Sequence, residues 1–509
     1  MRPSSSPSDP PGERERGGTS ASRTAGGAER TPPDDHAPAE PTPDSSSARG
    51  GGTAGTGGGL FDGVLARGRV REAASDRAWL QAMLDVEAAL ARAQARVGLV
   101  PAEHAEAVTL ACRADAFDLG AIGAGAAASG NPVVPLVRAL TEAVPGPAAG
   151  AVHKGATSQD VLDSAAMLVA HRALGPLLAD LEAAADAAAG LAEAHRGTVM
   201  AGRTLLQQAL PVTFGLEAAG WLVGLDEATR RLAELRRTRL AVQLGGAAGT
   251  LASLGAAGSE VVAALADELG LAEPVLPWHT VRTRVAELAG ALGTAAGVTG
   301  KVARDVTLLA QTEVAEVRER GPAGRGGSST LPHKRNPVAA VAALACAEQA
   351  PGLVATLLAA MVQEHQRAAG AWHAEWRPFG DLLRATGSAA AWLRDCLERL
   401  EVDPGRMRHN LDATGGLLLA ERVATALTPG LGRLAAHELV QQACAESLAA
   451  GRPLAAVLHD RPEVRDVLDQ GEVERLLDPA GYLGSAGAFV DRALRSWRSA
   501  RPSGAQEGP

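Results

Sequence analysis

The sequence predicts an all-α protein whose centre is a bundle of long helices. Hydrophobic residues make up 46% of the 509 residues but aromatic residues only 3%, and alanine and leucine dominate the apolar set. Side chains of this kind favour closely packed helices, whereas strands are enriched in β-branched and aromatic residues. The chain also lacks a convincing run of alternating strand residues, although short strands could lie within 240–256.

Composition and helical pattern divide the chain into successive parts. Its beginning is rich in Ser, Pro, Gly and charged residues, which cannot bury enough apolar surface to offset the chain entropy lost on folding. Helical patterns then dominate until the last few residues. The expected parts are a disordered N-terminal extension (1–58), an N-terminal helical domain (59–160), a central helical bundle (161–395) that carries a loop (321–337), a C-terminal helical domain (396–500) and a disordered tail (501–509).

Apolar residues at helical spacing predict the individual helices. The first runs from a cap at Ser75 or Asp76 to a stop at Gly98. Further helices rich in alanine and leucine are predicted over 162–196, 210–241, 283–320 and 338–370. A helix of 30 residues spans about 45 Å. Several such helices expose apolar stripes that one chain does not cover, so we expect them to pack against other subunits.

Charge and cysteine content exclude several classes of function. The net charge of −9 gives no indication of binding to nucleic acid or to an anionic membrane. The four cysteines are far apart, with no spacing typical of a metal site, which indicates reduced thiols in the cytoplasm. Neither an apolar run long enough to span a membrane nor a secretory signal is visible. The expectation is therefore a cytoplasmic protein without a metal ion or another cofactor.

The stretch GGSSTLPHKRNP (326–337) contains more polar residues than a simple loop needs. The helix before it is predicted to stop at 321–322, and Asn336 and Pro337 are expected to start the next helix as N-cap and first-turn proline. A helix N-terminus presents free N–H groups and a partial positive charge, to which Lys334 adds a full charge. The stretch therefore predicts a binding site for a carboxylate.

Two other polar segments interrupt the apolar helices. HKGATSQD occupies 153–160, directly before a long predicted helix, and GRTLLQQALP occupies 202–211. A lone Thr-Ser-Gln-Asp run is more often a helix cap than a site. Three such segments in one alanine-rich chain nevertheless favour a binding or catalytic site.

The three segments together resemble the conserved regions of the fumarase/aspartase superfamily. GSSTLPHKRNP is similar to the signature loop of that superfamily, and HKGATSQDVLDSA and GRTLLQQALPVTFG are similar to its other two regions, in the same order. The resemblance covers roughly residues 60–500. It implies a three-part all-α fold, a homotetramer, active sites that each combine one region from three subunits, and a small di- or tricarboxylate substrate.

The resemblance also implies roles for individual residues. Enzymes of this superfamily move a proton beside a carboxylate and stabilise the resulting aci-carboxylate, largely by electrostatics. Ser328 matches the base of the loop, His153 is expected to support proton transfer, and Arg203 could bind a substrate anion or form a structural ion pair. The predicted catalytic residues are Ser328, Ser329, His153 and Lys334. The predicted substrate-binding residues are Thr157, Ser158, Gln159, Arg203, Thr204, Gln207 and Asn336.

Leu205 stands where superfamily members that expel an amine carry a histidine. An amine must be protonated as it leaves and needs a general acid, whereas a carboxylate or nitrite leaves or attacks as a stable anion. Trp376 similarly stands where adenylosuccinate lyases carry an arginine that holds a phosphate. Both changes argue against an adenylosuccinate lyase. Within the superfamily, GATSQDVLD and QEHQRAAGAWHAEW resemble the 3-carboxy-cis,cis-muconate cycloisomerase subfamily. A nitrosuccinate lyase, an amine-expelling lyase and a non-catalytic member are the alternatives.

Overall fold

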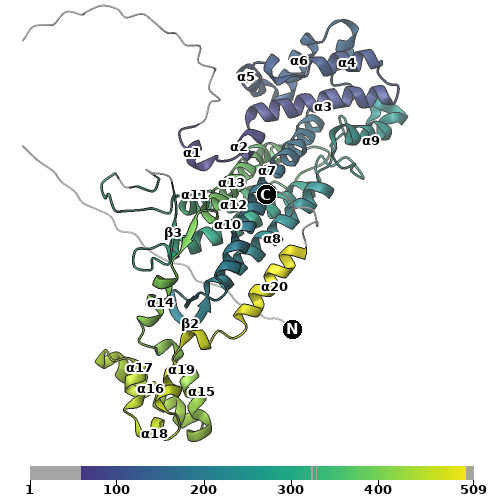
Figure 1. Cartoon of the computed structure of the whole chain (residues 1–509). Helices are drawn as coiled ribbons and strands as arrows, with labels where there is room; N and C mark the ends of the chain where they lie inside the picture. Colours follow the sequence, from purple (N-terminus) through teal and green to yellow (C-terminus); the bar gives the residue numbers. More distant parts are fainter. Residues whose placement is uncertain (1–58, 322–324, 328, 500–509) are drawn as a thin grey trace, which may run out of the picture. The chain divides into compact units, whose positions relative to one another are not determined.

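The computed structural model describes residues 59–321, 325–327 and 329–499 (Figure 1). Helices dominate this part of the chain. The disordered extension expected over 1–58 and the disordered tail expected over 501–509 lie outside the described residues. The boundaries expected between the three helical parts stay predictions.

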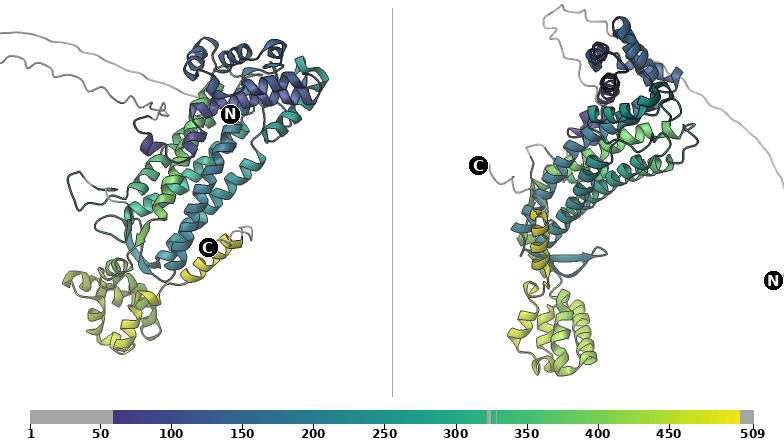
Figure 2. Two further views of the ribbon diagram at one scale, coloured as in Figure 1. Left: turned by 45° about the horizontal axis from the view of Figure 1, so that its top comes forward. Right: turned by 90° about the vertical axis from the view of Figure 1, so that its right-hand side faces the viewer.

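Four long helices form the centre of the protein, and each packs against two of the others (Figure 1, Figure 2). They are α7 (Ser158–Ala194), α8 (Phe214–Thr238), α10 (Thr283–Leu309) and α13 (Ala371–Leu397). Two shorter helices, α11 (Val338–Ala347) and α12 (Ala350–Ala359), pack on α10 and α13. With 37 residues, α7 is about 55 Å long. Its length separates the two ends of the bundle.

The central helix α7 has both a strong start and an apolar body. Thr157 and Asp160 form a capping box at its N-terminus, which satisfies N–H groups that would otherwise lack partners. Leu174, Leu177 and Leu181 are fully buried. Alanines dominate much of the rest of the helix, and their small side chains let the neighbouring helices approach closely.

The N-terminal part is organised by α3 (Asp76–Arg96), which lies across one end of the bundle (Figure 2). Ser75, one of the two caps that the sequence predicts, caps α3 by accepting a hydrogen bond from the Ala78 N–H at 3.2 Å. α3 packs on α7 and on α4 and α9. The other helices of this part are α1 (Asp62–Leu65), α2 (Val70–Ala73), α4 (Ala102–Ala111), α5 (Leu119–Ser129), α6 (Val133–Ala143) and α9 (Gly258–Leu269), with 3-10 turns at Ala114–Ala116, Gly146–Ala151 and Ala252–Ala257.

The C-terminal part has a hydrophobic cluster of its own, separate from the main core. The last helix, α20 (Ala486–Ser499), does not join this cluster but packs on α8 and α7, with Trp497 in the main core. The elements of this part are α14 (Pro404–Asp412), α15 (Ala420–Leu431), α16 (Arg433–Ala450), α17 (Leu454–His459), α18 (Pro462–Arg465) and α19 (Gln470–Leu476), with 3-10 turns at Leu417–Leu419 and Pro479–Gly481.

Two pairs of short strands interrupt the helices, and two of these strands overlap segments that were predicted as helices, 210–241 and 283–320. β1 (Val199–Thr204) pairs antiparallel with β2 (Gln207–Thr213), and β3 (Val317–Glu319) pairs antiparallel with β4 (Leu400–Val402). The prediction of helix over 310–320 was therefore wrong, because α10 already ends at Leu309 and β3 pairs with a distant strand. This tertiary pairing overrides the local helix propensity. Within 240–256 the structure has only an isolated bridge, from Ala241 to Ala272.

By length and hydropathy alone, two segments could cross a membrane. One is α7, whose most apolar window is 72% buried inside the protein, as in the core helix of a bundle. The other, Val338–Ala359, is 39% buried. It consists of two helices, α11 and α12, and exposes apolar side chains that include Val341 and Leu358.

Candidate active site

One of the three polar segments, 153–160, lies at one end of the bundle, and the other two, 202–211 and 326–337, lie at the opposite end. Thr157 caps the N-terminus of α7, whereas the hairpin of β1 and β2 follows its C-terminus. Arg203 of this hairpin pairs with Glu316, which directly precedes β3 and the loop 321–337. We call the surroundings of Thr157 the α7 end, and those of the hairpin and loop the loop end. Because α7 is about 55 Å long, one chain cannot bring its own two ends together.

His153 at the α7 end is held by Glu87 of α3. The fully buried Glu87 carboxylate accepts hydrogen bonds from the His153 backbone N–H at 3.0 Å and from Nδ1 at 2.7 Å. Burial alone would lower the pKa of His153, but the hydrogen bond and charge of Glu87 and the charge of Asp160 outweigh it and raise the pKa. The side chain is 20% exposed. Because a carboxylate only accepts, Nδ1 carries the proton there, which leaves Nε2 for a ligand.

Thr157, Ser158 and Gln159 begin α7, but only the first two are accessible. Thr157 and Ser158 are half-buried, and Thr157 Oγ1 accepts a hydrogen bond from Arg367 at 2.9 Å. Gln159 is fully buried and donates from Nε2 to Asp163 at 3.1 Å and to the His279 carbonyl at 2.8 Å. The amide of Gln159 therefore holds the site together from inside.

The Asp160 carboxylate organises the backbone around the N-terminus of α7. It accepts hydrogen bonds from the Thr157, Gly245 and Gly246 backbone N–H groups, all at 2.9 Å, and contacts His279 Nε2 at 2.7 Å. Both oxygens are thus engaged, and the residue is 1% exposed. Asp160 thereby holds the backbone at Gly245 and Gly246 against α7, and both of its oxygens have partners within the protein.

A buried ionic cluster between α7, α10 and α13 supports the α7 end. Arg282 of α10 donates to both oxygens of Asp163, at 2.7 and 3.0 Å, and to Glu375 of α13, at 2.5 to 3.2 Å. Trp372 Nε1 donates to Asp163 at 3.0 Å. Burial alone would lower the pKa of Arg282, but the two carboxylates raise it and keep the side chain charged. The cluster ties α7, α10 and α13 together, and no local sequence pattern revealed it.

Arg367 is a site residue that sequence reasoning missed. It lies in the segment between α12 and α13 and reaches Thr157, the N-cap of α7. Its signal in the sequence is weak, a polar run QEHQR at the end of an apolar stretch. Its role becomes visible only when the fold brings residues 157 and 367 together.

At the loop end, Arg203 forms the structural ion pair that was one of its two predicted roles. Its guanidinium donates to both oxygens of the fully buried Glu316 carboxylate, at 2.7 and 2.9 Å. Thr204 and Gln207 are exposed at the tip of the hairpin. Between them, Leu205 and Leu206 have φ values of 50° and 66°. Two positive φ values fit a tight hairpin turn that usually carries Asn and Gly, and the Leu205 side chain is 97% exposed.

The loop itself departs from the expected arrangement at its helix N-terminus. Ser329 and Lys334 are exposed, whereas Ser328 lies outside the described residues. α11 begins at Val338, with Pro337 as N-cap. The Glu319 carboxylate already accepts hydrogen bonds from its first free N–H groups, those of Ala339 at 3.0 Å and Ala340 at 2.7 Å. The prediction that this helix N-terminus is open to a substrate anion was therefore wrong.

Asn336 closes the base of the loop. Its backbone N–H and its Nδ2 both donate to the Gly326 carbonyl, at 2.8 and 3.2 Å. Gly326 has a φ of 72°, and a Cβ there would come within 2.6 Å of the Asn336 carbonyl oxygen. Only glycine fits this close approach. In this chain, Asn336 therefore fixes the loop geometry, while Lys334 projects from it.

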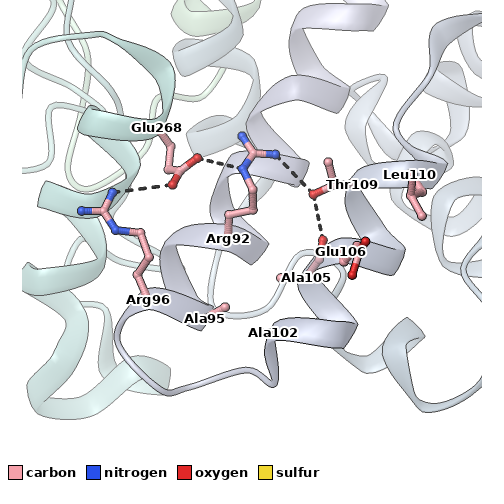
Figure 3. Close-up of a pocket in the computed structure, with 9 residues that line it drawn as sticks. All are labelled: Arg92, Ala95, Arg96, Ala102, Ala105, Glu106, Thr109, Leu110 and Glu268. Carbon is pink, nitrogen blue, oxygen red and sulfur yellow. Dashed lines mark hydrogen bonds and ion pairs between the residues drawn. The ribbon is translucent and has the colours of Figure 1, made fainter.

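A separate pocket of about 630 Å³ lies between α3, α4 and α9 (Figure 3). It contains none of the predicted site residues. Its cations have partners: Arg92 Nε contacts Glu268 at 2.7 Å, Arg92 Nη1 donates to Thr109 at 3.2 Å, and Arg96 contacts Asp267 at 3.2 Å. The charges that line this pocket are therefore balanced within the protein.

Similarity to known proteins now decides the family. A family model described as a lyase matches residues 65–352, which is more than half of the chain. The chain belongs to this lyase family, the fumarase/aspartase superfamily. A second family model, described as the C-terminus of adenylosuccinate lyase, matches residues 416–493. The all-α fold class and the superfamily predicted from the sequence are confirmed.

Individual superfamily members are similar to the chain over most of their length. It is 51% identical over 438 residues to 3-carboxy-cis,cis-muconate cycloisomerase of Pseudomonas aeruginosa, covering 86% of the chain and 95% of that protein. It is 48% identical over 447 residues to nitrosuccinate lyase of Streptomyces davaonensis, covering 86% and 94%. The crystal structure of 3-carboxy-cis,cis-muconate lactonizing enzyme from Pseudomonas putida matches with a TM-score of 0.82 at 46% identity, covering 86% and 99%.

Proposed function

We propose that the chain is a cytoplasmic cycloisomerase that converts 3-carboxy-cis,cis-muconate to a carboxymuconolactone. The observation that carries this proposal is its 46–51% identity to cycloisomerases of that name, over 95–99% of their length. The hairpin tip supports the same reaction class. Leu205 offers no acid where amine-expelling relatives carry a histidine, and an attacking carboxylate needs none, because its pKa is about 4.

The reaction forms one C–O bond and one C–H bond. A carboxylate oxygen of the substrate adds to the carbon β to a second, conjugated carboxylate, and the electron pair moves into that second carboxylate as an aci-carboxylate. The α-carbon then takes a proton. Lys334 of the loop is suited to stabilise the extra negative charge. His153, whose pKa is raised by Glu87, is suited to hold a proton near neutral pH.

The proposed active site is shared among copies in a homotetramer. The α7 end and the loop end of one chain are separated by the length of α7, so the site at each α7 end must be completed by the loop ends of other copies. In our proposal, the exposed apolar side chains of α11 and α12, such as Val341 and Leu358, pack between copies. Ser329 of one chain then approaches His153 and Thr157 of another, and Ser328 keeps its predicted role as the base of the loop.

A nitrosuccinate lyase is the second candidate, because of the 48% identity to the Streptomyces davaonensis enzyme. Nitrite also departs as a stable anion, so the missing acid at Leu205 is equally compatible with this reaction. An amine-expelling lyase is less favoured, since the described hairpin tip presents leucines where such an enzyme needs an acid.

A paired assay on the purified enzyme distinguishes these candidates. One cuvette holds 3-carboxy-cis,cis-muconate, whose diene absorbance falls on lactonisation, and the other holds nitrosuccinate, followed by nitrite release. Rapid loss of the diene without nitrite release is the expected result. Nitrite release alone would replace the cycloisomerase by the lyase. Turnover of neither substrate would contradict both and weaken the argument from Leu205.

A further inference from the structure

We propose that Arg367 binds a carboxylate of the substrate at the α7 end. This proposal rests on the proposed function, because it requires a substrate with several carboxylates. Its guanidinium makes three hydrogen bonds, to Thr157 Oγ1 at 2.9 Å, to the Ala247 carbonyl at 3.0 Å and to the Gly246 carbonyl at 3.4 Å. All three acceptors are neutral. In the described part of the chain, the positive charge of Arg367 therefore has no counter-ion.

The other arginines of the site show the contrast. Arg282 contacts two carboxylates and Arg203 contacts one, so their charges are neutralised within the protein. Asp160, the acid beside Thr157, has both oxygens occupied by backbone N–H groups and His279. It is therefore not available as a partner for Arg367. A partly buried cation without a counter-ion favours an anionic ligand.

The position of Arg367 suits substrate binding. Thr157 is the N-cap of α7, and the positive end of the helix dipole adds to the charge of the guanidinium. His153 precedes Thr157 by four residues. The charge of Asp160 raises the pKa of His153, and the Asp160 carboxylate accepts a hydrogen bond from the Thr157 backbone N–H. Arginine has five N–H donors, and three of them are used in the contacts above, which leaves two for a carboxylate. Arg367 is thus held in place by neutral acceptors while its charge is free to act.

The alternative is a purely structural arginine that ties the segment 361–370 to α7. Substrate kinetics separate the two roles. For the substrate-binding role, Arg367→Gln keeps polar contacts but removes the charge, so KM for carboxymuconate should rise about 10- to 100-fold, the range typical of a charge-assisted hydrogen bond, with little change in kcat. Arg367→Lys should restore part of the loss. The control Arg433→Gln, an exposed arginine at the start of α16, should leave both parameters unchanged.

A binding measurement keeps this proposal distinct from the proposed function. Isothermal titration of full-length enzyme with propane-1,2,3-tricarboxylate, an unreactive tricarboxylate, should show binding to wild type and to Arg433→Gln, and much weaker binding to Arg367→Gln. This pattern in an enzyme that does not turn over carboxymuconate would refute the cycloisomerase but support Arg367 as an anion-binding residue. Equal binding by wild type and Arg367→Gln, or a loss confined to kcat, would overturn the proposal.

If Arg367→Gln does not give a folded protein, chemical modification of wild type decides. Phenylglyoxal should modify Arg367, and propane-1,2,3-tricarboxylate should protect it, as measured by peptide mass spectrometry. Arg433 serves as the internal control and should be modified equally with and without the tricarboxylate. Modification of Arg367 at an unchanged rate in the presence of the tricarboxylate would overturn the proposal.

Discussion

The α7 end and the loop end both carry charged and polar side chains, but these side chains are buried at the α7 end and exposed at the loop end. At the α7 end, Asp160, Asp163 and Arg282 are buried, and each makes several hydrogen bonds. At the loop end, Lys334 and Ser329 are exposed, although Glu316 pairs with the Arg203 guanidinium and Glu319 accepts hydrogen bonds from the N-terminus of α11. One end is a rigid, preorganised cradle. The other projects functional groups away from its own chain.

The two ends therefore have different roles in the site. Rigid support lowers the cost of binding a charged substrate, because the polar groups need not reorganise. The exposed side chains that the structure describes at the loop end do not contact the α7 end of their own chain, but they can complete the α7 end of another copy. Substitutions that disturb each end separately test this division of roles.

The largest effect on stability is expected from Arg282→Met at the α7 end. The change leaves Asp163 and Glu375 buried without their shared cation, which should destabilise the fold by about 3–5 kcal/mol. Urea unfolding at one fixed protein concentration measures it. The exposed control Arg433→Met should change stability by about 0.5 kcal/mol or less. A loss below about 1 kcal/mol for Arg282→Met would mean that the buried cluster is not what supports the α7 end.

Lys334→Met at the loop end should show the reverse pattern. Because the side chain is exposed, stability should stay within about 0.5 kcal/mol of wild type, while kcat/KM should fall about 100- to 1000-fold through lost stabilisation of the aci-carboxylate. The adjacent exposed Arg335→Met is the matched control and should lose less activity. Equal losses for the two variants would indicate a general effect of charge in place of a specific role for Lys334.

Glu87→Gln should change the pH dependence of activity with a smaller effect on its maximum. Without the Glu87 charge, burial dominates and the pKa of His153 falls, so the limb of the kcat/KM profile that reports His153 should move to lower pH. The raised pKa also means that the pair stabilises the native fold fully below the ordinary pKa of histidine, and that this contribution is lost as the pH rises through the raised value. Exposed Glu103→Gln is the control. An unmoved limb would show that His153 does not control it.

Most long helices could be predicted from the sequence, but their interruptions could not. Periodic apolar residues and local caps such as Ser75 define helices without knowledge of the rest of the fold. β3 depends on pairing with β4, a strand far along the chain, and α10 ends at Leu309, before β3 begins. The open helix N-terminus after the loop was also wrong, because Glu319 reaches it only in the folded protein.

The candidate site was predictable where its chemistry is local in sequence. The segment around Thr157 and the loop around Lys334 stand out as polar runs between apolar helices. Arg282 was not found, because its partners Asp163 and Glu375 are 119 and 93 residues away. Arg367 was missed for the same reason, since it meets Thr157 across 210 residues. Supporting and counter-ion roles emerge only when helices pack.

Complementation between two inactive variants tests whether each site combines the α7 end of one chain with the loop end of another. Chains carrying His153→Gln and chains carrying Lys334→Met are expected to be almost inactive alone. Co-expressed with different tags and isolated as mixed tetramers, they should regain about a quarter of wild-type activity, because random assembly gives that share of sites two intact ends. Isolated mixed tetramers that remain as inactive as both parents would contradict the claim.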